Sequence, residues 1–430
     1  MHSVKVLILA DDFTGAMDTA VQLSKRGVRT VVCTHAEADI FKDGLAGFTE
    51  SDDGKVIEAI SVNINCRHIS PEDAFLQIKK VLSFYADIPY IYLKTDSVLR
   101  GNLSALFASA LDVLKTDIFF APAYPQVERT TINGHQMDRG IPIDQTSFAE
   151  DPLNPIKNSY IPEILNQDYF IPAELLPVIN ESTEIDFSRN GSKHHQVYAF
   201  DAGCELDLHR IAGVLMVQDK LKVCAGCAGF MDVLANVLFT EQEIVVQSSA
   251  MQNLQNTKEP VVYLSCSAQP ITRRQIAYAR SHGFPVEKIP KHLLSGCKSE
   301  KIEHLAEDVG LRLEDYLMQG RSVILASNTD DEDFIQTVGD DFHDCLLQFL
   351  GAVTEKLVSS GYRKIAVFGG DGAYAIMKKL GCECIFLGKE IQPGVPLSKL
   401  GIIPPVEMVT KSGGLGEDHV VLAIENAMRG

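Results

Sequence analysis

The amino-acid sequence predicts an α/β protein with two domains, each built on a mostly parallel sheet. Short apolar runs alternate with amphipathic runs along nearly the whole chain, which is typical of strand and helix in alternation. A Gln-, Asn- and Ser-rich stretch at 241–259 interrupts this alternation, and 430 residues are enough for two hydrophobic cores. We therefore expect a domain at 1–240, a linker at 241–259 and a second domain at 260–430.

The N-terminal domain is expected to follow the strand and helix order throughout. Its short apolar runs predict strands at 4–9, 29–33, 56–62, 89–93, 117–122, 196–200 and 222–224. The amphipathic runs between them predict helices at 16–25, 70–85, 103–114 and 206–215, and one that ends near 238. Ser70 and Pro71 form a typical helix start, with Ser as the cap and Pro in the first turn.

The C-terminal domain repeats the pattern, with strands predicted at 261–264, 322–326, 364–368 and 406–409. Helices are predicted after 271 and at 346–359, 373–380 and 418–428. Two strand-to-helix turns are rich in glycine, at 369–372 and 410–416. Such turns expose backbone N–H groups that suit nucleotide phosphates, although many glycine turns serve sterics alone. Neither turn has the spacing of a Walker A loop.

Composition excludes several classes of protein. A formal net charge of -18 at pH 7 argues against a nucleic-acid surface. No apolar run approaches the roughly 20 residues of a membrane span, and the chain starts with a strand instead of a signal peptide, so we expect a cytoplasmic protein. The ten cysteines lie among apolar neighbours, as reduced core residues do. Cys224 and Cys227 have CxxC spacing without a second pair, which favours a structural role over a metal or redox site.

The first strand ends in two acidic residues, Asp11 and Asp12, followed by Thr14 and Gly15. Ligands of open α/β folds bind at the carboxyl ends of the strands, so both acids are candidates for chemistry. Taken alone, a helix cap at Asp12 or Thr14 is the more common use of this pattern.

Cationic turns follow three further strands of the same domain. They contain Arg67, then Lys94 and Arg100, then Arg129. Together these residues supply the positive charge that an acidic protein needs in order to bind a carboxylate or phosphate. Asp96, between two of them, could position a hydroxyl or accept its proton.

The segment 134–155 is rich in Gly, Pro and Asp and has little periodicity. Long irregular segments often cover binding sites, so we expect a substrate-covering excursion here. His135 in this segment is a candidate substrate ligand, and a hydrogen-bonded loop histidine is an equal alternative.

Six separated stretches resemble, in order, the four-carbon acid sugar kinase family. They are ADDFTGAMD (10–18), KTDSVLRGN (94–102), APAYPQVERTTINGHQMDRGIPI (121–143), GGDGAYAI (369–376), EIQPGVP (390–396) and TKSGGLG (410–416). The resemblance extends from residue 4 to residue 427.

The resemblance implies a sugar-acid domain followed by an ATP domain, with the active site in the cleft between them and γ-phosphoryl transfer to the terminal hydroxyl of the acid. The implied substrate contacts are Asp12, Arg67, Lys94, Asp96, Ser97, Arg100 and Gly101. The implied nucleotide contacts are Ser265, Ser267, Gly369, Gly370, Asp371, Gly372, Lys411, Ser412, Gly413 and Gly414. Mg²⁺ and a homodimer are expected as well.

Three positions depart from the family pattern. Gly372 replaces a Thr, Leu415 replaces a Phe, and the segment 151–155 reads DPLNP where the 3-oxo-tetronate branch has a sequence like HPLTP. The first two remove no charged group, so we expect them to change details of the nucleotide contacts and not the activity itself. The third favours D-threonate or D-erythronate as the substrate, with 3-oxo-tetronate as the alternative.

In the mechanism that we expect, Arg67 and Arg100 bind the carboxylate or the hydroxyls of the substrate. Asp12 would orient the attacking hydroxyl and accept its proton, with Asp96 as the rival base, and domain closure would exclude water. A non-catalytic sugar-acid sensor would explain the cationic turns but leaves the glycine turns without a role. An NAD-dependent oxidoreductase is disfavoured because no GxGxxG motif with a downstream acid is present.

Overall fold

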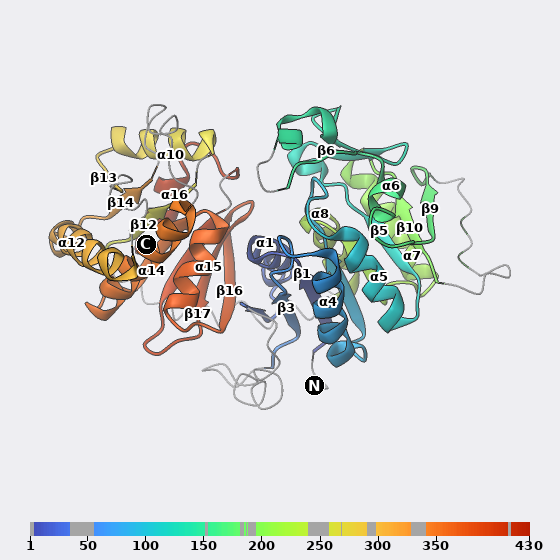
Figure 1. Cartoon of the computed structure of the whole chain (residues 1–430), viewed down its shortest axis with the longest axis horizontal. Helices are drawn as coiled ribbons and strands as arrows, with labels where there is room; N and C mark the ends of the chain where they lie inside the picture. The colour runs from blue at the N-terminus through green and yellow to red at the C-terminus, as the bar shows by residue number, and fades with distance from the viewer. Residues whose placement is uncertain are drawn as a thin grey trace. The chain divides into compact units, whose positions relative to one another are not determined.

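The computed structural model of the chain describes residues 4–34, 56–150, 154–180, 185, 187, 195–239, 258–267, 269–289, 298–327, 341–411 and 414–430. The chain divides into two compact units, Met1–Ser248 (unit 1) and Ser249–Gly430 (unit 2). Both belong to the α/β class that the sequence predicts (Figure 1). Most of the expected linker, up to residue 257, lies outside the described residues.

Unit 1 is built on a parallel sheet whose strands are almost entirely buried, except for the edge strand at Ala173–Leu176. The strand order is β2 (Thr30–Cys33), β3 (Ala59–Asn63), β1 (Val6–Ala10), β4 (Tyr90–Lys94), β11 (Val223–Gly226), β5 (Ile118–Ala121), β10 (Val197–Phe200) and β9 (Ala173–Leu176). Helices cover both faces, which explains why its strands are continuous apolar runs without polar alternation.

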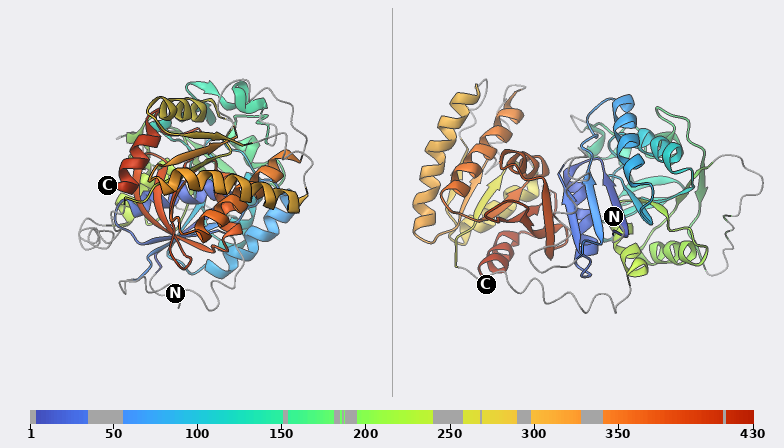
Figure 2. Two further views of the ribbon diagram at one scale, coloured as in Figure 1. Left: turned by 90° about the vertical axis from the view of Figure 1, so that its left-hand side faces the viewer. Right: turned by 90° about the horizontal axis from the view of Figure 1, so that it is seen from below.

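The helices of unit 1 form two layers. On one face α4 (Pro71–Tyr85), α5 (Leu103–Leu114) and α6 (Ile161–Leu165) pack together. On the other face α1 (Phe13–Ser24), α8 (Ala228–Leu238) and α7 (Glu205–Val217) do so (Figure 2). Ser70 caps α4 by accepting a hydrogen bond from the Asp73 N–H at 3.1 Å, as its sequence pattern predicts.

The segment that we expected to be irregular contains a small antiparallel sheet instead. Its strands are β6 (Arg129–Ile132), β7 (His135–Asp138) and β8 (Ile141–Pro142). Each connection is a two-residue turn, 133–134 and 139–140, in which both residues have positive φ. Turns of this kind match the twist of the strands, and Asn-Gly at 133–134 is a strong signal for one. The predicted lack of regular structure is therefore wrong for 135–142, while the substrate-covering role of the segment stays a prediction.

Unit 2 has a sheet of five parallel strands extended by two antiparallel ones. The order is β13 (Val286–Lys288), β14 (Val323–Ala326), β12 (Val262–Ser265), β15 (Lys364–Phe368), β18 (Glu407–Lys411), β17 (Val395–Leu400) and β16 (Cys384–Gln392). Helices α10 (Pro270–Ser281) and α16 (Val420–Arg429) pack together over an apolar core that includes Tyr263, Phe368 and Ile424.

The other described helices of unit 2 form a second layer. They are α12 (Ser299–Met318), α14 (Phe342–Ser359) and α15 (Gly370–Lys379), of which α12 and α14 lie side by side (Figures 1 and 2). None of the helices in the described ranges combines the length and the hydropathy that a membrane crossing requires.

The register of each sheet aligns the ends of its strands. In unit 1, Lys94 is paired with Ala10 on one side and with Gly226 on the other, and Ala10 is also paired with Asn63. In unit 2, Ser265 is paired with Phe368, and Phe368 with Lys411. The turns that follow these residues therefore share one carboxyl edge within each unit, where α/β proteins bind ligands.

Candidate active site

Arg67 lies at the centre of the carboxyl edge of unit 1 and joins two acids. Its Nε and Nη2 donate to the two carboxylate oxygens of Asp11 at 2.7 and 2.9 Å, and its Nη1 donates to Asp12 Oδ2 at 2.7 Å. Burial acts to lower the pKa of Arg67, but Asp11, Asp12 and a third carboxylate outweigh it and hold that pKa well above its ordinary value. The guanidinium is thus a permanent positive charge whose planar donors are largely engaged.

Asp12 has two roles in this arrangement. Its Oδ1 accepts a hydrogen bond from the Gly15 N–H at 2.8 Å and so caps α1, which is the alternative that sequence patterns favour at such a position. Its Oδ2 accepts from Arg67. The side chain is 24% exposed, compared with 11% for Asp96, so Asp12 is the more accessible of the two candidate bases.

Asp96 is held by the turn that follows β4. Arg100 donates to its two oxygens from Nε at 3.2 Å and from Nη2 at 3.0 Å, and the Val98 N–H donates to Oδ1 at 3.0 Å. Burial acts to raise the pKa of Asp96, but Arg100 and Arg67 together bring it far below its ordinary value. Asp96 is therefore a stable carboxylate and a weak proton acceptor.

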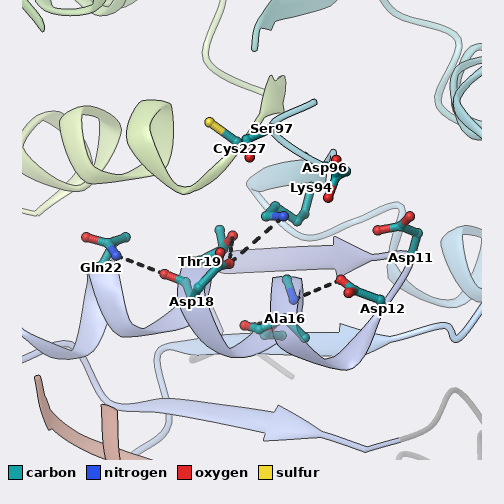
Figure 3. A network of polar contacts seen from close by, with 12 residues as sticks. Asp11, Asp12, Ala16, Asp18, Thr19, Gln22, Lys94, Asp96, Ser97 and Cys227 are labelled. Atoms are coloured by element: carbon teal, nitrogen blue, oxygen red, sulfur yellow. Dashed lines mark hydrogen bonds and ion pairs between the residues drawn. The ribbon is translucent and has the colours of Figure 1, made fainter. Parts of the chain in front are cut away.

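Lys94 enters the same cluster from the end of β4. Figure 3 shows its side chain directed toward α1, where the ammonium lies 3.9 Å from Asp18 Oδ1. Burial acts to lower the pKa of Lys94, yet the surrounding carboxylates, Asp18 first among them, raise it above the ordinary value. The unit thus brings Asp12, Arg67, Lys94, Asp96 and Arg100 together, as the pattern of polar turns predicts.

The small antiparallel sheet packs against the turn after β4. Gln136 donates to the Ser97 carbonyl at 2.8 Å, and Arg129 donates to the Ser97 hydroxyl and, at 3.2 Å, to Asp138 Oδ1. The ring of Phe148, on the short 3₁₀ turn Ser147–Glu150, has Arg129 at 5.4 Å and Arg100 at 5.9 Å. The segment therefore contacts candidate site residues.

Gly101 is required by the same cluster. Its φ of +93° is unfavourable for any residue with a Cβ, and a Cβ there would lie 2.6 Å from Asp11 Oδ2. His135, by contrast, is the first residue of β7, where it hydrogen-bonds Ser159 Oγ at 3.0 Å and lies beside the Tyr160 ring, as a structural histidine does.

In unit 2, Ser265, the 369–372 turn and Lys411 lie at the aligned carboxyl edge. The Ser265 hydroxyl is buried without a hydrogen-bond partner among the described residues. Lys411 is 1% exposed, its Nζ donates to the Leu415 carbonyl at 2.9 Å, and it lies 4.9 Å from the centre of the Phe368 ring. Burial lowers the pKa of Lys411 to about 7. An orphaned hydroxyl and a buried lysine, two strands apart at the same sheet edge, fit an anionic ligand.

The glycine turn differs in detail from the sequence prediction. Helix α15 begins at Gly370, so the turn forms its first residues. A Cβ on Gly369 or on Gly372 would lie 2.6 Å from the Cys266 sulfur. Packing against Cys266 therefore requires glycine at both positions, whether or not they bind phosphate. Asp371 lies 3.7 Å from His343 Nε2.

The structure gives less detail on the other predicted nucleotide contacts of unit 2. Ser267 accepts a hydrogen bond from Gln269 at 3.2 Å and another from Thr272 at 3.1 Å, both at the start of α10. Around Gly414 the space for a Cβ is open. Ser412 and Gly413 lie outside the described residues.

Two other expectations concern metals and thiols. Within the described part of the chain, no group of three or more His, Cys, Asp or Glu side chains has the arrangement of a metal site. Cys224 and Cys227 are buried free thiols, and Cys227 donates to the Pro122 and Ala123 carbonyls at 3.3 and 3.4 Å.

Sequence reasoning missed two residues of unit 1, Asp18 and Phe148, and one residue of unit 2, Cys266. Asp18 is the last residue of the ADDFTGAMD motif, but its position in a predicted helix does not indicate that it faces Lys94. Phe148 had no signal at all, because a single aromatic residue in a polar segment is unremarkable. Cys266 could have been found from the pairing of its neighbour Ser265 with Phe368, had the strand register been known.

Known proteins match both units. Models of a sugar-binding N-terminal domain and a nucleotide-binding C-terminal domain match residues 6–234 and 262–421. A D-threonate kinase from Salmonella typhimurium is 27% identical and covers 97% of both chains. A D-erythronate kinase from Heliobacterium modesticaldum is 24% identical, covering 96% of this chain and 94% of its own length. A 3-oxo-tetronate kinase from Methylobacterium radiotolerans is also 24% identical and covers 95% of both.

A solved structure from Salmonella typhimurium has the same fold, with a TM-score of 0.77 over 97% of this chain and 98% of its own, at 20% identity. The two domain models lie in order along the chain, and the first alone spans more than half of it. This chain therefore belongs to the four-carbon acid sugar kinase family.

Proposed function

We propose that this chain is an ATP-dependent kinase that phosphorylates the terminal (4-) hydroxyl of a four-carbon sugar acid, giving the 4-phosphate and ADP. The observation that carries the proposal is the cluster of Asp12, Arg67, Lys94, Asp96 and Arg100 in the unit that matches a sugar-binding domain. A nucleotide-binding domain model over unit 2 supplies the second half of the argument.

The preferred acids are D-threonate and D-erythronate. The DPLNP sequence of 151–155 and the names of two relatives support this choice. The third relative supports 3-oxo-tetronate as the alternative. The chain is about equally identical in sequence to kinases of three different acids, so an activity measurement decides between the acids.

Asp12 is the better candidate for the general base. Each of its oxygens accepts one hydrogen bond, so each keeps a lone pair for a substrate hydroxyl. Asp96 receives a bidentate contact from Arg100, and its depressed pKa makes it a poor proton acceptor. In the step that we propose, Asp12 takes the hydroxyl proton as the hydroxyl oxygen bonds to phosphorus. The bond from phosphorus to the ADP oxygen breaks, and its electron pair leaves with ADP.

The substrate carboxylate fits best near Arg100 and Arg129. Both guanidinium groups lie within 6 Å of the Phe148 ring centre, which brings them to one side of the cluster. Arg67 already donates from all three of its nitrogens to Asp11 and Asp12. We therefore assign Arg67 to holding these two acids and the other two arginines to binding the anion.

The nucleotide is assigned to unit 2, at the edge formed by Ser265, the 369–372 turn and Lys411. ATP supplies the phosphoryl group, and Mg²⁺, when bound, neutralises charge on its phosphates. Mg²⁺ commonly binds through substrate phosphates and few protein ligands, so the ATP phosphates would hold it here. The Ser265 hydroxyl and the Lys411 ammonium would donate to phosphate oxygens.

The proposal is tested by mixing the purified chain with ATP, Mg²⁺ and a panel of four-carbon acids and following ADP release. D-threonate, D-erythronate and 3-oxo-tetronate form the core of the panel, with their enantiomers as controls. We expect one acid to be phosphorylated at least tenfold more efficiently than the rest. Binding of an acid without ADP release from any of them would favour a sugar-acid sensor and refute the kinase.

The base assignment is tested with Asp12→Asn. Asparagine is also a good helix cap, so the start of α1 should be kept while the proton acceptor is removed. We expect turnover to fall by about 10²- to 10⁴-fold, the usual contribution of a general base. Nucleotide affinity, measured by calorimetry, should stay within twofold. Turnover close to that of the unaltered chain would make Asp12 a capping residue only.

A further inference from the structure

The ammonium of Lys94 is buried, and its hydrogen-bond donors lack partners among the described residues. The residue is 4% exposed, and its Nζ makes no hydrogen bond to the described residues, the 3.9 Å contact with Asp18 being longer than one. The neighbouring Thr95 hydroxyl is likewise buried and has no hydrogen-bond partner in the part of the chain that the structure describes. Donors left unsatisfied in a folded interior are costly, so they point to a ligand that completes them.

The position of this ammonium is defined by Gly15. A Cβ on Gly15 would lie 2.8 Å from Lys94 Nζ and 2.5 Å from Asp12 Oδ1. Both atoms therefore lie around one point at the first turn of α1, and the glycine leaves that point open. Lys94 is thus next to the proposed base.

Asp18 faces the ammonium from the following turn of α1. Its Oδ1 accepts a hydrogen bond from the Thr19 hydroxyl at 3.1 Å, and Gln22 donates to its backbone carbonyl at 2.8 Å (Figure 3). Burial raises the pKa of Asp18 to about 6, with Lys94 opposing this shift. At neutral pH the carboxylate is therefore mostly ionised and attracts the ammonium.

We infer that Asp18 is a positioning residue for phosphoryl transfer, which holds the Lys94 ammonium beside Asp12 so that it binds the oxygens of the transferred phosphoryl group. The inference rests on the proposed kinase function. Lys94 keeps its three protons throughout and donates hydrogen bonds to phosphoryl oxygens. The proton of the acceptor hydroxyl goes to Asp12, and ADP takes the electron pair of the broken bond.

Lys94 suits this role better than the arginines of the cluster. Arg67 donates from all three of its nitrogens to Asp11 and Asp12, and Arg100 is assigned to the substrate carboxylate. An ammonium is a compact charge whose donors can turn toward a group that moves between two oxygens. A buried cation at this point would stabilise the charge that develops in the transition state.

The charged and titratable groups around the ammonium come from several elements. They are Asp11 and Asp12 between β1 and α1, Asp18 on α1, Arg67 after β3, Tyr92 on β4, Asp96 and Arg100 in the turn after β4, and Cys227 after β11. Asp18 is the largest single influence that raises the pKa of Lys94. Its removal should therefore lower that pKa more than the removal of any other one carboxylate.

The first test compares affinities measured by calorimetry for the 4-phosphate product and for the unphosphorylated acid. In Lys94→Met we expect the product affinity to fall about tenfold or more, the usual effect of losing a charge-assisted hydrogen bond, with the acid affinity within threefold of normal. Lys79→Met is the matched control, since Lys79 on α4 pairs with Asp112 on α5 and neither residue belongs to the cluster around Lys94. Equal losses for both ligands, or no loss, would overturn the assignment of Lys94.

The second test separates positioning from simple structural support through the pH profile of kcat. In Asp18→Asn the alkaline limb should move to lower pH by about one unit, because Lys94 loses its main carboxylate neighbour. Asp112→Asn, which breaks the control pair, should leave the limb unchanged. A uniform loss of kcat at every pH, or an unmoved limb, would refute the role of Asp18. A chain that phosphorylates no acid of the panel would refute the proposed function itself, which the panel assay shows before either variant is made.

Discussion

Lys411 should take up a proton when a nucleotide binds to unit 2. Its side chain is buried against the Phe368 ring, and burial lowers its pKa to about 7. Phosphate oxygens near the amine would favour its charged form and raise that pKa again. The binding of nucleotide and the protonation of Lys411 are therefore coupled, and the coupling is measurable as protons per site.

The size of the effect depends on pH. With a pKa of about 7, about nine-tenths of the amines are neutral at pH 8 and about one-tenth at pH 6. Binding should therefore take up close to one proton at pH 8 and about a tenth of one at pH 6. The sign is an uptake of protons, because a bound anion raises the depressed pKa and the neutral fraction of the amines is then protonated.

The assay is titration calorimetry of ADP at both pH values, each in two buffers with different ionisation enthalpies. The slope of the binding enthalpy against buffer enthalpy gives the protons taken up. Lys411→Arg is the control, because a guanidinium stays charged at both pH values. The difference between the two proteins removes the protons of the nucleotide itself. Equal uptake by both proteins at pH 8 would show that Lys411 is charged before binding or distant from the phosphates.

The other predictions concern the packing of unit 1. Asp96→Asn should cost about 3 to 5 kcal/mol of stability at pH 7, since it leaves the partly buried Arg100 without its carboxylate. The depressed pKa of Asp96 means that this contribution is present above about pH 4 and is lost at more acidic pH, so hydrogen exchange of β4 should show a smaller difference at pH 3.5 than at pH 7. Gly226→Ala would place a Cβ 2.4 Å from the Ala121 carbonyl oxygen, so we expect a loss of about 1 to 3 kcal/mol in the same exchange measurement. Gly213→Ala, in open space on α7, should instead stabilise by about 0.5 to 1 kcal/mol, and a loss there would show that the clash is not the cause.

The class of the fold and the general place of the site follow from sequence pattern alone. Parallel strands bring their carboxyl ends to one edge, so Asp12, Arg67 and Asp96 could be predicted to lie together although they are far apart in the chain. Their partners could not be predicted, because a pattern does not say whether a guanidinium will meet a substrate or a protein carboxylate. Arg67 illustrates this, since its donors go to Asp11 and Asp12.

The small antiparallel sheet shows a different limit. Its strands are only two to four residues long, so period-two alternation has no room to appear. The local signal was in the turns, where Asn133 and Gly134 both adopt positive φ. The position of Asp18 against Lys94 depends on how α1 packs on the sheet, and this is a property of tertiary structure that no local motif contains.

The close pairing of charges around Arg67 also affects how ligands arrive. Each cation of this edge lies near a carboxylate, and the whole chain carries a net charge of -18, so little attraction extends into the solvent. Negatively charged metabolites would then meet a repelling field at long range and find their attractive contacts only on arrival. Added salt, which slows the association of ligands that are steered by opposite charge, should instead leave the rate of capture unchanged or increase it.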